Sequence, residues 1–255
     1  MLDPICYNKP FLAEVIARID FAAPLERLEK GLPVKLLSAI IKIFPIVEPP
    51  ADLSVHEVMI SDAAVDRKTR ALKQRKFFTK DRLRELTLTS ESVFVQFKSY
   101  KSYSETRDQF GTVVAAVLAE FPDTVVARFG IRYINQIDMP MADPTSWQDY
   151  IDEKLLGSRR QILDGEEITR LITIVELKYG DVALRFQYGM PNPDHPATIR
   201  RSLFVLDFDA SVTQAHSLSE TLGHMDAGHT RIQDLFERSI TNALREKMDV
   251  RPVQN

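Results

Sequence analysis

The feature that most constrains this chain is a segment of seventeen residues, TVVARFGIRYINQIDMP, running from Thr124 to Pro140. Apolar and polar side chains alternate along it, which is the period of a β-strand with one buried face. The apolar side carries Val125, Ala127, Phe129, Ile131, Tyr133 and Ile137, and the polar side carries Arg128, Arg132, Gln136 and Asp138. At ~3.3 Å per residue such a strand reaches roughly 40 Å, so we expect it to cross a whole sheet as its spine or to join two sheets.

Patterns elsewhere in the chain predict an α+β protein with a largely antiparallel sheet. Alternating apolar residues predict strands at 11–21, 73–79, 85–89, 93–100 and 199–208. A hairpin is predicted from strands at 168–179 and 182–188, joined by the two-residue turn Gly180-Asp181. Helical spacing of apolar residues predicts helices at 33–44, 102–121 and 229–248. We therefore expect long helices packed on one face of the sheet, in two similar-sized halves.

Loop-forming residues between Met139 and Ser146 predict a boundary in the middle of the chain. The N-terminal α+β half would cover residues 1–140 and end in the spine strand. The C-terminal α+β half, residues 141–255, would hold the hairpin, one further strand and a long helix. Both halves place strands before a long helix, but no residue-level repeat is visible, so duplication is only a hypothesis.

Composition excludes several classes of protein. The 255 residues are 44% hydrophobic, which suits a real core, and the net charge of −3 argues against a protein that coats nucleic acid. The single cysteine, Cys6, excludes an intramolecular disulfide framework and a cysteine-rich zinc site. Neither a secretory signal pattern nor a long apolar span is visible, so we expect a soluble, cytoplasmic protein with no membrane partner. Motifs for nucleotide loops, hydrolase elbows and thiol redox centres are missing, and nothing predicts a cofactor.

Four short motifs carry a resemblance to a known family. They are Pro10-Phe-Leu-Ala-Glu14-Val15, Arg128-Phe-Gly-Ile-Arg132-Tyr133-Ile134-Asn135, Leu206-Asp207-Phe208-Asp209 and Phe236-Glu-Arg-Ser-Ile240-Thr241. With them the chain resembles an uncharacterised, sporadically distributed family of bacterial proteins, whose members have about this length. The Arg-Tyr-Ile-Asn block is the distinctive one. The family has no established reaction, so the resemblance implies a bacterial, cytosolic protein and no catalytic residues.

The two arginines of the spine are candidates for an anion site. Arg128 and Arg132 share one strand face, ~13 Å apart, and Gly130 between them leaves a gap in the side-chain cover. Two guanidinium groups beside a gap can bind a phosphate or a carboxylate, and Tyr133 and Asn135 add polar groups on the same strand. The alternative is that both arginines pair with acidic residues on adjacent strands.

A basic run from Arg67 to Arg84 holds nine Lys or Arg in eighteen positions. Two phenylalanines stand in its middle, and cations interleaved with aromatic rings are typical of a surface that binds single-stranded nucleic acid. Arg75, Lys76 and Lys80 are the candidate contacts. The alternative is a solvated sheet edge whose cations discourage association between sheets.

Two aspartates and two histidines are candidate metal ligands. Asp207 and Asp209 lie at i and i+2 at a predicted strand end and so point to one face, while His224 precedes the last predicted helix and His229 stands at its start. Carboxylates and imidazoles bind divalent metals, although the spacing matches no familiar motif. A solvated strand end and a polar loop are the alternatives.

Two functions remain open from the sequence. The first is a cytosolic binding or interaction protein with an anion-recognising groove, whose ligand is a nucleic acid or an acidic protein partner. The second is a metal-dependent enzyme acting on a phosphate-containing substrate, in which the spine arginines stabilise charge in the transition state. A homo-oligomer joined at sheet edges is a further hypothesis.

Overall fold

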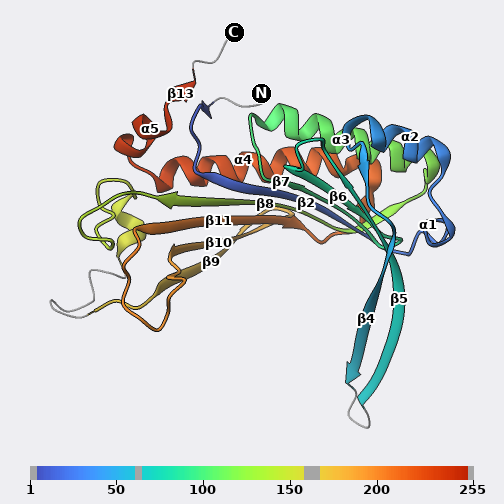
Figure 1. Cartoon of the computed structure of the whole chain (residues 1–255), viewed down its shortest axis with the longest axis horizontal. Helices are drawn as coiled ribbons and strands as arrows, with labels where there is room; N and C mark the ends of the chain where they lie inside the picture. The colour runs from blue at the N-terminus through green and yellow to red at the C-terminus, as the bar shows by residue number, and fades with distance from the viewer. Residues whose placement is uncertain (1–4, 61–64, 158–166, 252–255) are drawn as a thin grey trace.

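The computed structural model describes residues 5–60, 65–157 and 167–251, with the backbone alone for 56–60 and 65–68. Its main feature is an eleven-stranded antiparallel sheet (Figure 1). Nine of the strands pair in the order β3-β5-β6-β7-β2-β8-β11-β10-β9, and the other two, β4 and β12, pair with β5 and β8. The strands are β2 (Leu12–Phe21), β3 (Ile46–Val47), β4 (Ala51–Ile60), β5 (Val65–Phe78), β6 (Arg84–Leu88), β7 (Ser92–Phe97), β8 (Val125–Asp138), β9 (Leu171–Tyr179), β10 (Val182–Met190), β11 (Leu203–Val212) and β12 (His216–Ser217).

Helices lie along one face of this sheet, as Figure 1 shows for α2, α3 and α4. The helices are α1 (Arg27–Lys30), α2 (Val34–Ile43), α3 (Tyr103–Glu120), α4 (Thr221–Ser239) and α5 (Asn242–Met248), with short 3-10 turns at η1 (Glu153–Leu156) and η3 (Leu218–Glu220). Near the ends of the chain, β1 (Cys6–Tyr7) pairs with β13 (Val250–Arg251). The predicted α+β fold with a largely antiparallel sheet is confirmed. None of the helices in the described ranges is long and apolar enough to cross a bilayer.

The predicted spine is confirmed as β8, a 14-residue strand that lies between β2 and β11. Its alternation differs from the prediction at one end. A register shift opposite β2 makes Ala127 an extra residue, so that Val126 is buried and Val125 is 46% exposed. From Arg128 onward the predicted alternation of faces holds.

Side-chain caps start α3 and the 3-10 turn η3 that leads into α4. The Ser102 hydroxyl accepts the Glu105 N–H at 3.2 Å and starts α3 as predicted. The predicted helix over 229–248 is wrong in its bounds, because a capping box at Ser217 and Glu220 starts helical structure earlier. The same segment also divides after Ser239, where Thr241 caps the separate helix α5.

The order of strands repeats within the chain. In the first half β2 is followed by β5, β6, β7 and α3, and these strands pair in the order β5-β6-β7-β2. In the second half β8 is followed by β9, β10, β11 and α4, and the pairing order is β9-β10-β11-β8. The two halves meet where β2 and β8 pair antiparallel, which supports the hypothesis of duplication. This repeat divides the chain before the spine, whereas the sequence placed the boundary behind it at residues 139–146; the division into 1–140 and 141–255 stays a prediction.

A two-stranded arm leaves the sheet on the side away from the helices (Figure 1). The arm consists of β4 and residues 65–74 of β5, which pair from Ala51 opposite Gln74 to Ile60 opposite Val65. The last four residues of β5 stay in the sheet and pair with β6. The face of the sheet beside the arm carries no long helix in the described residues, and we call it the uncovered face.

Candidate functional site

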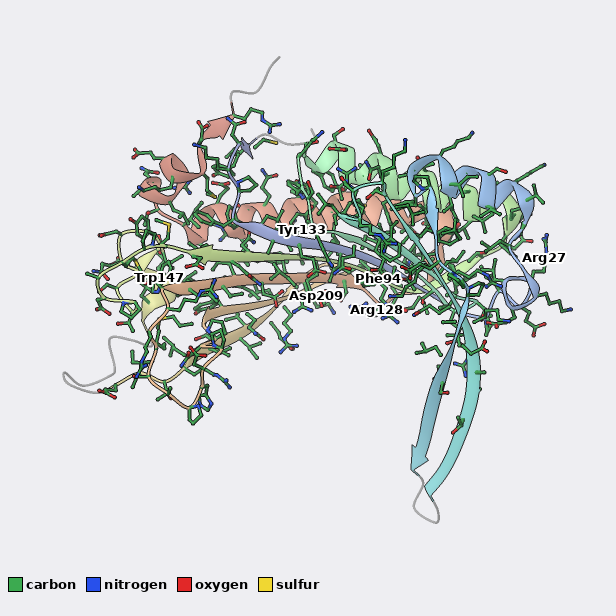
Figure 2. The ribbon with its side chains drawn as sticks, viewed as in Figure 1. Arg27, Phe94, Arg128, Tyr133, Trp147 and Asp209 are labelled. Carbon is green, nitrogen blue, oxygen red and sulfur yellow. The ribbon has the colours of Figure 1, made fainter. Side chains whose placement is uncertain are left out.

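The alternation along the strands sorts the predicted site residues onto two faces. Figure 2 shows Arg128 and Asp209 on the uncovered face, whereas Tyr133 lies on the side of the helices. Arg132 and Asp207 join the first group, and Asn135 lies with Tyr133 because both are buried beneath α4. Arg128 and Arg132 therefore lie on the opposite side of the sheet from Tyr133 and Asn135, and the four side chains cannot contact the same ligand.

Arg132 is paired with an aspartate of the neighbouring strand. Its Nε lies 2.8 Å from Asp207 Oδ1 and its Nη2 lies 2.6 Å from Oδ2, which is a bidentate ion pair. These hydrogen bonds raise the pKa of Arg132, although partial burial opposes them. The alternative given for this residue, a cross-strand ion pair, is what the structure contains.

Arg128 fills the gap that Gly130 leaves. A Cβ at Gly130 would lie 3.0 Å from Arg128 Nη1 and 3.3 Å from its Cζ, so the guanidinium lies on the glycine backbone. The guanidinium lies 3.8 Å from Asp20 and 3.9 Å from Asp209, which is too long for a hydrogen bond. The glycine thus makes room for the arginine itself, and Arg128 retains free hydrogen-bonding capacity toward a ligand.

These side chains belong to a row of alternating charge that crosses four strands. We call it the charged row: Arg18 and Asp20 on β2, Arg128 on β8, Asp209 on β11 and Arg185 on β10. Arg18 and Asp20 form an ion pair at 2.7 Å, and Arg185 is directly opposite Asp209 in the ladder. The guanidinium of Arg185 has no ion-pair partner within 4 Å among the described residues. Counted with the Arg132–Asp207 pair beside it, and with Glu176 of β9, which is directly opposite Arg185 in the ladder, this surface holds four cations and four carboxylates.

A small hollow of about 60 Å³ adjoins the end of this row. It is lined by Arg132, Arg185, Gln187, Asp207 and Asp209. Burial raises the pKa of Asp209, with Arg128 and Arg132 opposing this effect. Arg185 and Gln187 are not among the site residues predicted from the sequence, although their alternation with Leu184 and Phe186 indicates that both face one side of the sheet.

The two aspartates should respond differently to neutralisation. We expect Asp207→Asn to lower the free energy of unfolding by ~1–2 kcal/mol, because it breaks a bidentate pair whose arginine is half exposed. Asp209→Asn should leave stability at neutral pH unchanged or raised. Since the folded-state pKa of Asp209 is raised, its contribution is present below the unfolded-state pKa and is lost as pH rises through the folded-state value. Urea denaturation at mildly acidic and neutral pH measures both variants, and equal losses for the two would contradict this assignment.

The three candidates from the basic run lie apart from the spine arginines. Arg75 is buried on the helix side, where burial lowers its pKa and Glu29 opposes the change. Lys76 lies on the uncovered face and pairs with Glu85 at 2.8 Å, and three strands separate its strand β5 from β8. Lys80 is exposed in the turn after β5. The structure does not bring these cations together with Arg128 and Arg132.

Other cations of the basic run are paired with glutamates. Arg70 pairs with Glu91, Arg82 with Glu48 at 3.2 Å and Arg84 with Glu105 at 2.8 Å. The aromatic rings of the run are also occupied. Phe77 is fully buried, and the guanidinium of Arg82 lies 4.9 Å from the ring of Phe78. Stacking of bases on these rings is therefore not supported.

The predicted metal ligands are separated by the sheet. Asp207 and Asp209 face the uncovered side, whereas His224 and His229 belong to α4 on the other side. The ring of His224 lies 4.3 Å from that of His216, and His229 stacks on Tyr103. Within the described residues no group of three or more His, Cys, Asp or Glu side chains is arranged to hold a metal ion.

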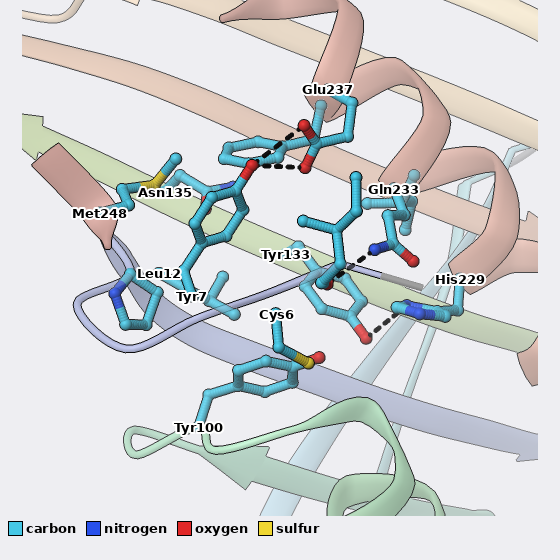
Figure 3. A pocket seen from close by; sticks show the side chains of 14 residues that line it. Cys6, Tyr7, Leu12, Tyr100, Tyr133, Asn135, His229, Gln233, Glu237 and Met248 are labelled. Carbon is cyan, nitrogen blue, oxygen red and sulfur yellow. Dashed lines mark hydrogen bonds between the residues drawn. The ribbon is translucent and has the colours of Figure 1, made fainter. Parts of the chain in front are cut away.

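A pocket of about 80 Å³ lies beneath α4, between that helix, β8 and the N-terminal segment (Figure 3). The Tyr7 hydroxyl donates to Glu237 at 2.8 Å, and burial together with this contact raises the pKa of Tyr7. Tyr133 Oη and His229 Nδ1 lie 3.1 Å apart, and Asn135 Nδ2 donates to the Leu206 carbonyl. Tyr133, Asn135 and His229 therefore line a pocket on the helix side instead of an anion groove.

A hydrogen-bonded network between α3 and α4 adjoins that pocket through His229, which lines it. The rings of Tyr103 and His229 stack at 3.6 Å, and the Tyr103 hydroxyl donates to Asp226 at 2.7 Å. Arg107 binds both oxygens of Asp226, at 2.7 and 2.9 Å. Burial opposes the charged form of Asp226, but the hydrogen bonds from Arg107 and Tyr103 prevail and lower its pKa. Burial raises the pKa of Tyr103, so this phenol stays protonated and the network joins two helices.

A groove of about 660 Å³ lies on the uncovered face beside the arm. Leu53 and Leu72 of the arm line it together with Phe94 of β7. Arg18 and Asp20 also line it, so the groove opens onto the charged row. Its apolar wall and its mixed charges can take an extended chain with both apolar and charged side chains.

Comparison of this sequence with protein-family models and with curated proteins finds no match. The interpretation of the groove and the charged row therefore depends on their own geometry.

Proposed function

We propose that this chain is a binding protein whose uncovered face holds an acidic segment of a partner protein. The observation that supports this most is the groove of about 660 Å³ between the arm and the sheet, which opens onto the charged row. In this arrangement the apolar side chains of the segment contact Leu53 and Phe94. Its carboxylates reach Arg128 and Arg185, whose guanidinium groups have no hydrogen-bonded acid within the described part of the chain. We place this activity in the bacterial cytoplasm, which the resemblance and the single cysteine imply.

An acidic protein segment fits these surfaces better than a nucleic acid. Binding of nucleic acid needs a continuous series of uncompensated cations along the phosphate backbone. Here the cations alternate with carboxylates, because Asp20 and Asp209 separate the three arginines of the row. A polyphosphate would be repelled at each aspartate, whereas a peptide can place apolar or amide groups there. A metal-dependent enzyme gains no support, because its four predicted ligands lie on two sides of the sheet.

A selection from a displayed peptide library tests this function. We expect the parent protein to enrich peptides that combine Asp or Glu with apolar residues. The dissociation constant of a selected, labelled peptide should rise about tenfold for Phe94→Ala and about fivefold for Arg185→Ala, as measured by fluorescence anisotropy. Arg238→Ala is the matched control, since this arginine is exposed on α4 and pairs with Asp234 on its own helix.

Two outcomes would overturn the proposed function. One is that the enriched peptides lack acidic residues, or that the selected peptide binds the parent and Arg185→Ala with the same dissociation constant. The other is tight binding of single-stranded RNA or DNA at physiological salt, because this would assign the uncovered face to a polyphosphate.

A further inference from the structure

The strand β9 is an edge without the usual protection. In the described part of the chain β9 pairs only with β10, and the ladder between them has no register shift over its nine residues. Proteins usually protect such edges with proline, bulges, charges or a covering element, because the unpaired backbone groups accept another strand. The sequence LITIVELKY has no proline and carries charge only at Glu176 and Lys178. The first half of this edge is thus open to strand addition.

Apolar side chains cluster at the same edge. Ile172 is 41% exposed, Ile174 is 49% exposed and Val175 is 36% exposed. These are three of the ten large apolar side chains that are exposed in the described residues, and they lie in one strand. Ile172 and Ile174 point to one face of the sheet and Val175 to the other, because side chains alternate along a strand. Apolar surface therefore borders the open edge on both faces.

The backbone at this edge is oriented for pairing. The two-residue turn at Gly180-Asp181 makes Tyr179 and Val182 a hydrogen-bonded pair of the hairpin. Along β9 the odd-numbered residues then direct their N–H and C=O groups to β10, and the even-numbered residues direct theirs to the open edge. The free donors and acceptors thus belong to Ile172, Ile174 and the charged residues beyond them.

The sequence around this edge is complementary to itself in one antiparallel register. With Thr173 opposite Thr173 of a second copy, Ile172 is opposite Ile174 and Arg170 is opposite Glu176, each pair occurring twice by symmetry. Arg170 and Glu176 are both exposed, so two ion pairs would flank an apolar centre. Charge complementarity of this kind favours a second copy over an unrelated strand.

We propose that β9 pairs with β9 of a second copy of this chain, antiparallel and centred on Thr173, so that one sheet continues through a homodimer. The symmetry axis is perpendicular to the sheet, as it is between β2 and β8 within the chain. Both uncovered faces then lie on the same side of the dimer, and both sets of helices on the other. This inference does not depend on the ligand of the groove.

Light scattering coupled to size exclusion, and sedimentation velocity over a wide concentration range, test the dimer with the full chain. We expect twice the mass of the 29.1 kDa chain. Ile174→Lys should raise the dimer dissociation constant more than tenfold, since it places a cation in the apolar centre. Ile41→Lys is the matched control, because Ile41 on α2 is 40% exposed and far from the edge, and this variant should remain a dimer.

A charge exchange tests the register independently. Arg170→Glu alone and Glu176→Arg alone should each weaken the dimer, because each places like charges opposite one another twice. The double variant Arg170→Glu/Glu176→Arg should restore the parent's dissociation constant to within about threefold. A parent that is monomeric throughout, a dimer that Ile174→Lys leaves intact, or a double variant as weak as the single ones would overturn the proposal. Circular dichroism and thermal melting confirm that each variant is folded.

Discussion

Replacing Gly189 with alanine is expected to lower the free energy of unfolding by more than about 3 kcal/mol. Gly189 lies in β10 with φ at +135°, a backbone conformation that L side chains rarely adopt. An alanine Cβ would also lie 2.1 Å from the Leu171 carbonyl oxygen and 3.2 Å from Ile172 Cα. Both are backbone atoms of β9, so no rotation of a side chain can relieve the contact. Urea denaturation of Gly189→Ala against the parent measures the loss.

Gly223→Ala is the control for this experiment. Gly223 lies in α4, and a Cβ there would meet no atom within 4 Å. Alanine should therefore stabilise the protein by about 0.5 kcal/mol through its higher helix propensity. If Gly189→Ala unfolded at the same urea concentration as the parent, the pairing of Gly189 with Ile172 would be wrong. The orientation of the β9 edge would then be wrong too, and with it the proposed dimer.

Strands with one buried, apolar face and one polar face were predictable from the sequence. β8 has one buried and one polar face, and its period of two persists from Arg128 to Asp138. The hairpin of β9 and β10 was also predictable, because Gly180 takes the positive φ of +61° that a tight turn needs. In both elements the local pattern and the tertiary burial agree, which is the condition under which sequence patterns are informative.

The arm and the start of α4 lack such a pattern. The arm extends away from the sheet, so burial against a core does not determine its residues, and the predicted strand at 73–79 reaches only its last two positions. The first turns of α4 are polar, and small residues bring them close to the sheet. A Cβ on Gly228 would lie 3.0 Å from Ile131 and 3.3 Å from Ala210. The helix therefore packs on the sheet here through a glycine, and this contact leaves no apolar stripe in the sequence. Without an apolar stripe, the sequence predicts for His224 and His229 either metal binding or, as the alternative, a polar loop before the last helix.

The candidate site was predictable only in part, for a related reason. Alternation along a strand tells which face a side chain occupies, but it does not tell which strand lies beside it. Arg128 and Arg132 were therefore placed on the correct kind of surface. Their acids on β2 and β11, and the position of Arg185 on β10 beside Asp209, depend on the pairing order β2-β8-β11-β10. Pairing order is a property of the whole fold, and no local pattern encodes it.

Phe208→Ala is expected to lower the free energy of unfolding by ~3–5 kcal/mol, the usual cost of truncating a buried aromatic ring. Phe208 is fully buried, stacks on Phe186 with ring centroids 4.5 Å apart, and meets Phe236 of α4 edge to face at 6.3 Å. Its removal leaves a cavity that two neighbouring rings cannot fill. Chemical denaturation of the variant and the parent measures the loss.

The adjacent residues along β11 make this prediction a test of the proposed binding surface. Asp209 points to the opposite face of the sheet from Phe208, so Asp209→Asn should keep the parent's stability while it changes the charged row. Suppose instead that Phe208→Ala leaves the free energy of unfolding unchanged and Asp209→Asn lowers it. The helices would then cover the face of the sheet that carries the charged row. The arginines would then be buried structural groups, and an acidic partner could not reach them.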